Sequence, residues 1–152
     1  MNALYQYSFA NIAQKLSFIG IVALLATAAT ATPIEAPVEV AAADWECGRS
    51  DGGGDVILKR LHTQFNKLFG APRLTMARGQ CYIVDCYGHY FGICNLDSTS
   101  RTEISGDRNV AGKANPESGS ICTIYPSDRR LRYHYGRNNY PTYFKNTDLR
   151  RC

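Results

Sequence analysis

The chain has 152 residues, 45% of them apolar and 20% charged, which is the composition of a globular protein and excludes wholesale disorder. This length predicts one domain. Lys and Arg number 17 against 13 Asp and Glu, so the net charge is only +4. Six cysteines in so short a chain indicate a disulfide framework or a metal site.

Residues 1–31 have the pattern of a secretory signal peptide. An uncharged apolar run from Leu16 to Thr27 precedes Ala29-Thr30-Ala31, which has the small-residue form of a cleavage site. The run is shorter than the roughly 20 apolar residues of a membrane-spanning helix. We therefore expect cleavage before Thr32 and a secreted, extracellular protein without stable membrane insertion. In that oxidising compartment cysteines pair.

Residues 32–46 are acidic, rich in Pro and Ala, and lack a periodic apolar face, so they predict a flexible tail. Packing is expected to begin near Trp45. Residues 47–152 are then the folded domain, with 16 basic and 9 acidic residues and a net charge of +7. The domain is therefore more basic than the whole chain.

One amphipathic helix is predicted from about Asp55 to Phe69, ended by Gly70 and Pro72. Its expected apolar stripe consists of Val56, Ile57, Leu61, Phe65, Leu68 and Phe69. Three glycines precede it without the strand and Gly-Lys-Ser/Thr of a phosphate-binding loop.

The strongest strand signals are residues 81–86 and 90–94, which predict a hairpin. With Gly88 and His89 as its loop, residue 84 would lie opposite 93, and Tyr82, Val84, Cys86, Phe91 and Ile93 would share one face. Further strands are expected at 121–125, 131–135 and 142–145, with a short one near 101–104. The predicted fold class is α+β, with the helix packed on a small antiparallel sheet stapled by three disulfides.

The cysteines are Cys47, Cys81, Cys86, Cys94, Cys122 and Cys152. A metal site at Cys81, Cys86 and His89 is the alternative to disulfides, and export, the even count and the lack of a Cys-x-x-Cys pair favour disulfides. Cys86 is expected on the helix-facing side of the hairpin, opposite Cys81 and Cys94, so Cys47–Cys86 is the preferred bond. Cys81 and Cys94 would then lie diagonally and bond Cys122 and Cys152 in an undetermined order.

The segments Gly79-Gln80-Cys81-Tyr82-Ile83-Val84-Asp85-Cys86 and Gly92-Ile93-Cys94-Asn95 resemble small cysteine-rich proteins secreted by filamentous fungi. Cys47-Gly48 followed by a helix fits the same order, so the resemblance covers about residues 47–95. Many members of that class are candidate effectors, and some resemble killer toxins. The resemblance therefore implies an effector-like, virulence-related role and carries over no active site.

Arg129, Arg130, Arg132, Tyr133, Tyr135 and Arg137 form the candidate binding residues, because arginines neutralise polyanions and tyrosines stack on bases or sugars. A solvated face of an ordinary strand is the alternative. The sequence predicts no catalytic residue, metal or cofactor. A small basic secreted nuclease using His89, His134, Glu103, Glu117 and Arg132 remains an alternative.

The leading hypothesis is therefore a secreted, effector-like monomer that binds a host or competitor target without catalysis. The target would be an unknown protein, a glycan or a polyanion. A membrane-active toxin, drawn to anionic surfaces by its charge, is a third hypothesis.

Overall fold

The computed structural model describes residues 43–152 of the chain. The predicted signal peptide and residues 32–42 of the predicted tail lie outside the described residues. Within residues 43–152, the helices are too short and too polar for any of them to cross a membrane.

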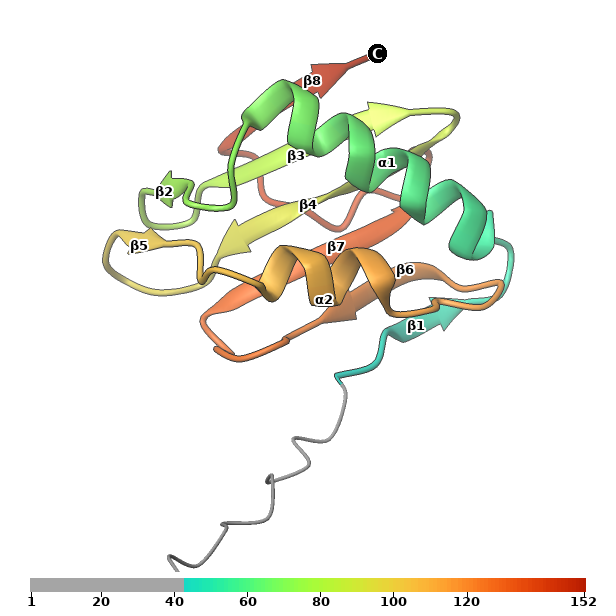
Figure 1. Cartoon of the computed structure of the whole chain (residues 1–152), viewed down its shortest axis with the longest axis horizontal. Coiled ribbons are helices and arrows are strands. Elements are labelled where there is room, and N and C mark those ends of the chain that lie inside the picture. Colours follow the sequence, from blue (N-terminus) through green and yellow to red (C-terminus); the bar gives the residue numbers. More distant parts are fainter. Residues whose placement is uncertain (1–42) are drawn as a thin grey trace, which may run out of the picture. The chain divides into compact units, whose positions relative to one another are not determined.

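The fold is α+β, as predicted, with a six-stranded sheet in the order β1-β6-β7-β4-β3-β8 (Figure 1). Its strands are β1 (Glu46–Arg49), β3 (Cys81–Cys86), β4 (His89–Asn95), β6 (Ser120–Ile124), β7 (Leu131–Arg137) and β8 (Thr147–Arg151). Neighbouring strands run antiparallel except β8, which lies parallel to β3. Two further strands, β2 (Thr75–Met76) and β5 (Arg101–Thr102), pair separately.

Helix α1 (Gly54–Phe69) matches the predicted helix closely, but its buried stripe is rotated from the predicted one. Leu58, Leu61 and Phe65 are buried, at the i, i+3 and i+7 positions that share one helix face. Val56, assigned to the stripe from sequence, is 68% exposed. Gly70 ends the helix with a φ of 77°, a conformation that glycine adopts without steric cost.

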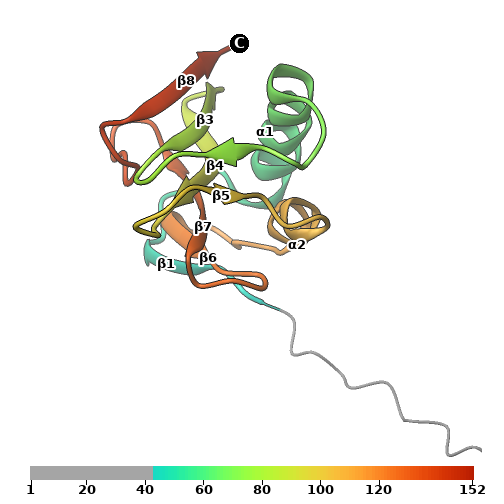
Figure 2. The same cartoon turned by 90° about the vertical axis from the view of Figure 1, so that its left-hand side faces the viewer.

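A second helix, α2 (Asp107–Lys113), makes the prediction of a single helix wrong. Its seven residues include only one buried apolar side chain, Ala111, so they carry little amphipathic signal. Both helices lie on the same side of the six-stranded sheet (Figure 2).

The hairpin forms with a register two residues away from the predicted one. Cys86 pairs with His89, and Val84 lies opposite Phe91 rather than Ile93, because Tyr87 and Gly88 make the turn. A shift of two preserves the alternation of side chains, so the predicted faces are correct. Val84, Cys86, Phe91 and Ile93 belong to the core cluster under the helices, and the partly buried Tyr82 packs against it.

The remaining strand predictions have mixed outcomes. Strands β6 and β7 lie where strands were expected, whereas residues 142–145 are not a strand and the chain pairs only from Thr147 onward. At the end of the segment assigned to the tail, Trp45 packs against the core, where packing was expected to begin, and Glu46 begins β1.

The sheet is covered on both faces. The larger cluster lies between the sheet and the two helices. On the opposite face, Tyr143, Phe144 and Leu149 pack against a smaller buried cluster of Cys81, Ile83, Tyr90 and Cys94. We call residues 138–146, which bring Tyr143 and Phe144 there, the strap.

All six cysteines form disulfides, as predicted, but the preferred pairing Cys47–Cys86 is wrong. The bonds are Cys47–Cys122, Cys81–Cys94 and Cys86–Cys152. In the observed register Cys81 lies directly opposite Cys94, so their proximity follows from the two-residue shift. Cys47 lies on β1 opposite Cys122 on β6, away from the helix start where it was expected.

Candidate binding groove beside the first strand

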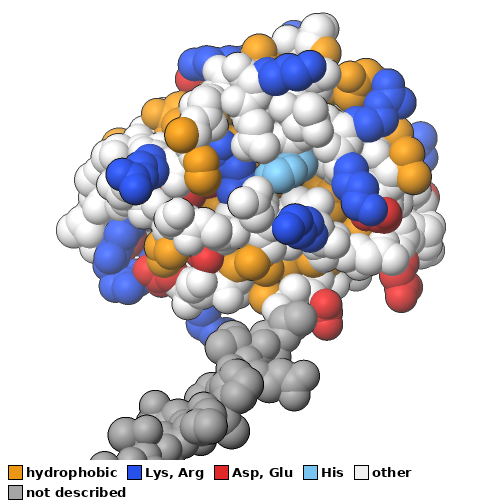
Figure 3. Space-filling model, viewed as in Figure 1, with side chains coloured by type: hydrophobic (Ala, Val, Ile, Leu, Met, Phe, Trp, Pro, Cys, Tyr) orange, Lys and Arg blue, Asp and Glu red, His pale blue; other side chains and the backbone are white. Residues whose placement is uncertain are grey.

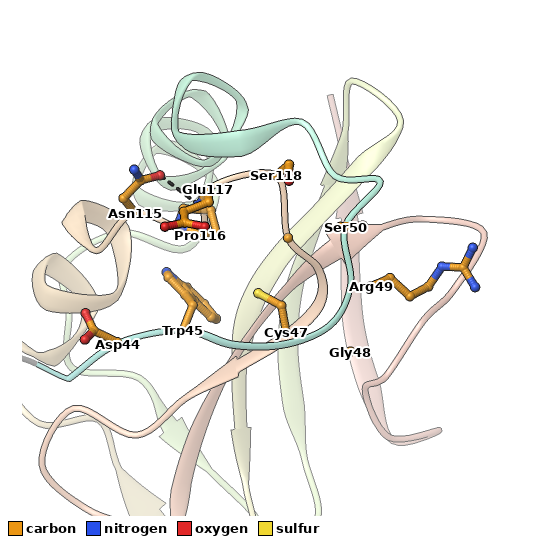
Figure 4. A pocket seen from close by; sticks show the side chains of 11 residues that line it. Asp44, Trp45, Cys47, Gly48, Arg49, Ser50, Asn115, Pro116, Glu117 and Ser118 are labelled. Atoms are coloured by element: carbon orange, nitrogen blue, oxygen red, sulfur yellow. Dashed lines mark hydrogen bonds between the residues drawn. The ribbon is translucent and has the colours of Figure 1, made fainter.

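An open groove of about 780 Å³ lies between β1 and the loop of residues 115–119. This volume falls within the range of small-ligand sites. Figure 4 shows the groove from close by. Its lining consists of Asp44, Trp45, Cys47, Gly48, Arg49, Ser50, Asn115, Pro116, Glu117, Ser118 and Gly119.

Hydrogen bonds of the indole N–H hold the Trp45 side chain in place in the groove. The indole Nε1–H lies 3.2 Å from the carbonyl oxygens of Ala111 and Ala114, at the end of α2. The ring also meets Phe91 and Tyr135, with centroids 6.5 and 6.0 Å away. An aromatic ring held at several points in this way is a rigid surface for a ligand.

The loop on the other side of the groove has an unusual backbone. Glu117 has a φ of 52°, in the left-handed region that disfavours any residue with a Cβ. The Asn115 Oδ1 accepts a hydrogen bond from the Glu117 amide at 2.9 Å, and Ser118 C=O accepts one from Gly52 at 2.7 Å. These bonds hold the exposed Glu117 side chain at the rim.

The loop also packs closely on the disulfide that closes the floor of the groove. A Cβ added to Gly119 would collide with the Sγ of Cys47, so only glycine fits there. The Cys47–Cys122 bond therefore joins β1 to β6 directly beneath the loop. Both walls of the groove are thus fixed before any ligand arrives.

The groove is acidic although the domain is basic. The carboxylates of Asp44 and Glu117 are exposed, and neither forms an ion pair within residues 43–152. Arg49, the only cation of the lining, pairs with Asp51 at 3.4 Å and lies over the Tyr140 ring at 4.5 Å. Figure 4 shows its side chain pointing away from Trp45.

The groove therefore offers an aromatic surface bordered by hydrogen-bonding groups. Two carboxylates accept, the Asn115 amide and the Ser50 and Ser118 hydroxyls can both donate and accept, and Trp45 supplies a ring. Such a set suits a ligand that has apolar faces and many hydroxyls.

The six binding residues predicted from the C-terminal part of the chain do not form one surface. Tyr133 and Tyr135 are fully buried on the helix side of β7, so neither ring can stack on a ligand. Tyr133 donates to Glu103 at 2.8 Å and Tyr135 donates to the Gly54 carbonyl at 3.1 Å. Burial raises the pKa of Tyr135 to about 12.

The four arginines of that set also lie apart. Arg129 and Arg130 precede β7, and Arg130 pairs with Asp128 at 2.8 Å. Arg137 ends the strand, about 20 Å away for a seven-residue strand, and lies 3.8 Å from Asp51. Figure 3 likewise shows Lys and Arg dispersed over the helix side of the molecule.

Arg132 and His134 point to the opposite face of β7, where they join a buried chain of hydrogen bonds. The Arg132 Nε–H donates to His134 Nε2 at 3.0 Å, which requires Nδ1 to carry the imidazole proton. That proton is donated to Thr142 Oγ1 at 3.0 Å, and Thr142 in turn donates to Tyr90 at 2.8 Å. Tyr90 donates to the Tyr140 carbonyl at 3.2 Å, so the chain fastens the strap to the sheet.

Glu103, a further member of the predicted nuclease set, is used in a different buried network. All five N–H groups of Arg108 donate hydrogen bonds to other residues of the protein. It bonds both oxygens of Glu103 at 2.8 and 2.5 Å, Asn66 Oδ1 at 2.9 Å, and the carbonyls of Gly70 and Ala71 at 2.6 and 3.3 Å. The pair is almost fully buried and satisfies carbonyls at the end of α1.

The three histidines are in separate places. His62, on α1, packs against Phe91, and His89 is a strand residue stacked on Tyr135 with ring centroids 6.0 Å apart. His134 lies under the strap. Among residues 43–152, no three His, Cys, Asp or Glu side chains form a group that could hold a metal ion.

Sequence reasoning missed the groove because its residues come from two segments that looked unstructured. Asp44 and Trp45 fell in the predicted tail, and residues 115–119 fell in a polar stretch rich in turn formers. The available signal was Trp45, the only tryptophan in the chain, two residues before Cys47.

The comparisons with known proteins leave the groove to be interpreted from its own chemistry. No family model matches this chain, and no curated protein or solved structure has significant similarity to it.

Proposed function

We propose that this protein is a secreted, effector-like binding protein that recognises a target on a host or competitor without catalysing a reaction. The observation that carries the proposal is the groove beside β1, an open and rigid surface in which Trp45 lies among exposed polar side chains. Ligand sites generally combine an aromatic surface with a few fixed polar groups in this way.

The three disulfides support the extracellular part of the proposal. Every cysteine of the chain is paired, which is typical of small domains that work in oxidising surroundings. The bonds Cys47–Cys122 and Cys86–Cys152 close loops with sequence separations of 75 and 66 residues. Each disulfide that closes a loop of this length stabilises a small domain by about 4 kcal/mol, because it restricts the unfolded chain.

The placement of ionisable side chains favours binding over the nuclease alternative. A nuclease needs an acid, a base and a cation around one phosphate. Here Glu103 is paired with Arg108 on the helix side, while Arg132 and His134 are bonded to each other on the opposite side. Glu117 stands at the groove, apart from both sites.

The test uses purified, fully oxidised protein in three assays. We expect saturable retention on immobilised glycans or heparin, no cleavage of RNA, and no dye release from anionic vesicles. RNA cleavage that is lost in His89→Ala or His134→Ala would replace the binding proposal with the nuclease. Dye release without retention on either support would replace it with the membrane-active toxin.

A further inference from the structure

We infer that the groove beside β1 binds a neutral oligosaccharide, with Trp45 as the stacking surface and Asp44 and Glu117 as hydroxyl acceptors. This inference rests on the proposed binding function and names the ligand class for one site. It differs from binding of a polyanion, which the charge of the domain as a whole would favour.

Trp45 supplies the aromatic surface of the groove. Its ring is neither fully buried nor loose, because the Nε1–H is bonded to two carbonyls while the side chain points into the space between β1 and the 115–119 loop (Figure 4). The apolar face of a sugar ring packs on a tryptophan, and a tryptophan already held in place loses little freedom on binding.

Polar side chains of the types that bind sugar hydroxyls line the groove together with that ring. Sugar hydroxyls are donors, and Asp44 and Glu117 present four carboxylate oxygens that only accept. Asn115, Ser50 and Ser118 also line the groove and can both donate and accept. The ring and the acceptors thus match the two faces that a neutral sugar presents.

Charge excludes a polyanion from this groove. The two carboxylates would repel sulfate or phosphate groups, and the one arginine of the lining is paired with Asp51 and stacked on Tyr140. A polyanion that binds this basic domain would therefore bind elsewhere, and it would leave Trp45 untouched.

The backbone at Glu117 provides a variant that separates binding from folding. The left-handed φ of 52° suits glycine better than glutamate. Glu117→Gly is therefore expected to keep or raise the melting temperature while it removes one carboxylate from the groove. A loss of binding in this variant could therefore not be attributed to a loss of folding.

The experiment uses the intrinsic fluorescence of Trp45, which is the only tryptophan in the chain and so reports on this groove alone. The ligands are neutral oligosaccharides of β-1,3-glucan, β-1,4-glucan, xylan, mannan and chitin, each titrated to millimolar concentration, with heparin as the polyanion. We expect at least one neutral oligosaccharide to change the emission saturably, and heparin to leave it unchanged.

Variants then test whether the response arises in the groove. Glu117→Gly and Asp44→Asn are each expected to raise the Kd for the oligosaccharide at least about tenfold, because each removes a charged hydrogen-bond acceptor. Asp148→Asn, on β8 at the other edge of the sheet, is the matched control and should bind normally. Unchanged binding in both groove variants would overturn the assignment of the site.

The outcomes also separate this inference from the proposed function. If no neutral oligosaccharide changes the emission while heparin retains the protein, the glycan inference fails and the binding function stands. If heparin changes the emission and the groove variants bind it more tightly, the ligand class is wrong. RNA cleavage would instead overturn the proposed function.

Discussion

His62 of α1 lies directly against Gly112 of α2, and the contact leaves no room for a larger residue. A Cβ built on Gly112 would come within 2.5 Å of the His62 Cγ. The imidazole continues inward to Phe91, with ring centroids 5.9 Å apart at an angle of 87°. At this point the close approach of the two helices therefore requires a glycine opposite His62.

This contact predicts a strong coupling between the two positions. Gly112→Ala should destabilise the protein by about 1–3 kcal/mol, the usual cost of overpacking. In His62→Ala the space opens, so adding Gly112→Ala there should cost much less. Urea unfolding of the two single variants and the double variant measures this. Additive effects would show that the helices shift apart freely.

The buried pair of Glu103 and Arg108 predicts a large difference between two arginine-to-lysine changes. Arg108→Lys loses the planar five-donor fork that bonds Glu103, Asn66 and the end of α1, so we expect a cost of about 3–5 kcal/mol. Arg130→Lys, in an exposed pair with Asp128, should change the stability far less, because solvent screens that pair. Equal losses in denaturant unfolding would contradict the structural role of Arg108.

His134 predicts an acid-dependent loss of stability. Burial, with a smaller contribution from Arg132, lowers the pKa of His134 to about 3. The unfolded chain binds this proton below the ordinary pKa of about 6.5, and the folded chain does not until about pH 3. The contribution of neutral, buried His134 to the free energy of unfolding is thus complete above pH 6.5. It is lost as the pH falls from 6.5 towards 3, by about 1.4 kcal/mol per pH unit.

The measurement is the free energy of unfolding between pH 7 and pH 4, together with the imidazole NMR signals. The His134 signal should not titrate in this range. His134→Gln, which cannot take up a proton, should show a shallower decline with falling pH than the wild type. A His134 signal that titrates near its ordinary value would contradict the buried hydrogen-bond chain.

Disulfide mapping checks the register of the hairpin. We expect Cys47–Cys122, Cys81–Cys94 and Cys86–Cys152 under non-reducing conditions. Trypsin leaves Cys81, Cys86 and Cys94 in one peptide, because no Lys or Arg lies between Cys81 and Cys94. Chymotryptic cleavage at Tyr82 and Tyr87 is needed to separate them. A Cys86–Cys94 bond would contradict both the register and the faces of the hairpin.

The hairpin shows how far periodicity alone can predict this fold. Alternation assigned Val84 and Phe91 to the helix side correctly, because any even shift of register preserves the two faces. It could not choose between turns at Tyr87-Gly88 and Gly88-His89, which differ by two in register. The disulfide prediction depended on distance across the strands, so it failed although the faces were correct.

The groove was beyond prediction for a different reason. Its two walls are about 70 residues apart in sequence, Trp45 with β1 on one side and residues 115–119 on the other. Only the pairing of β1 with β6 brings them together, and β1 is a four-residue strand with every residue exposed. Such a strand has no apolar alternation by which it could be recognised.

Both outer strands of the six-stranded sheet are tied covalently to the interior. Cys47 on β1 is bonded to Cys122 on β6, and Cys152, directly after β8, is bonded to Cys86 at the end of β3. An outer strand that peels away can pair with the same strand of another molecule, which begins domain swapping or fibril growth. We therefore expect the oxidised protein to resist exchange of either outer strand, and reduction of the two bonds to remove this protection from both edges. The same two bonds that stabilise the folded chain are therefore expected to slow association through the edges of the sheet at high concentration.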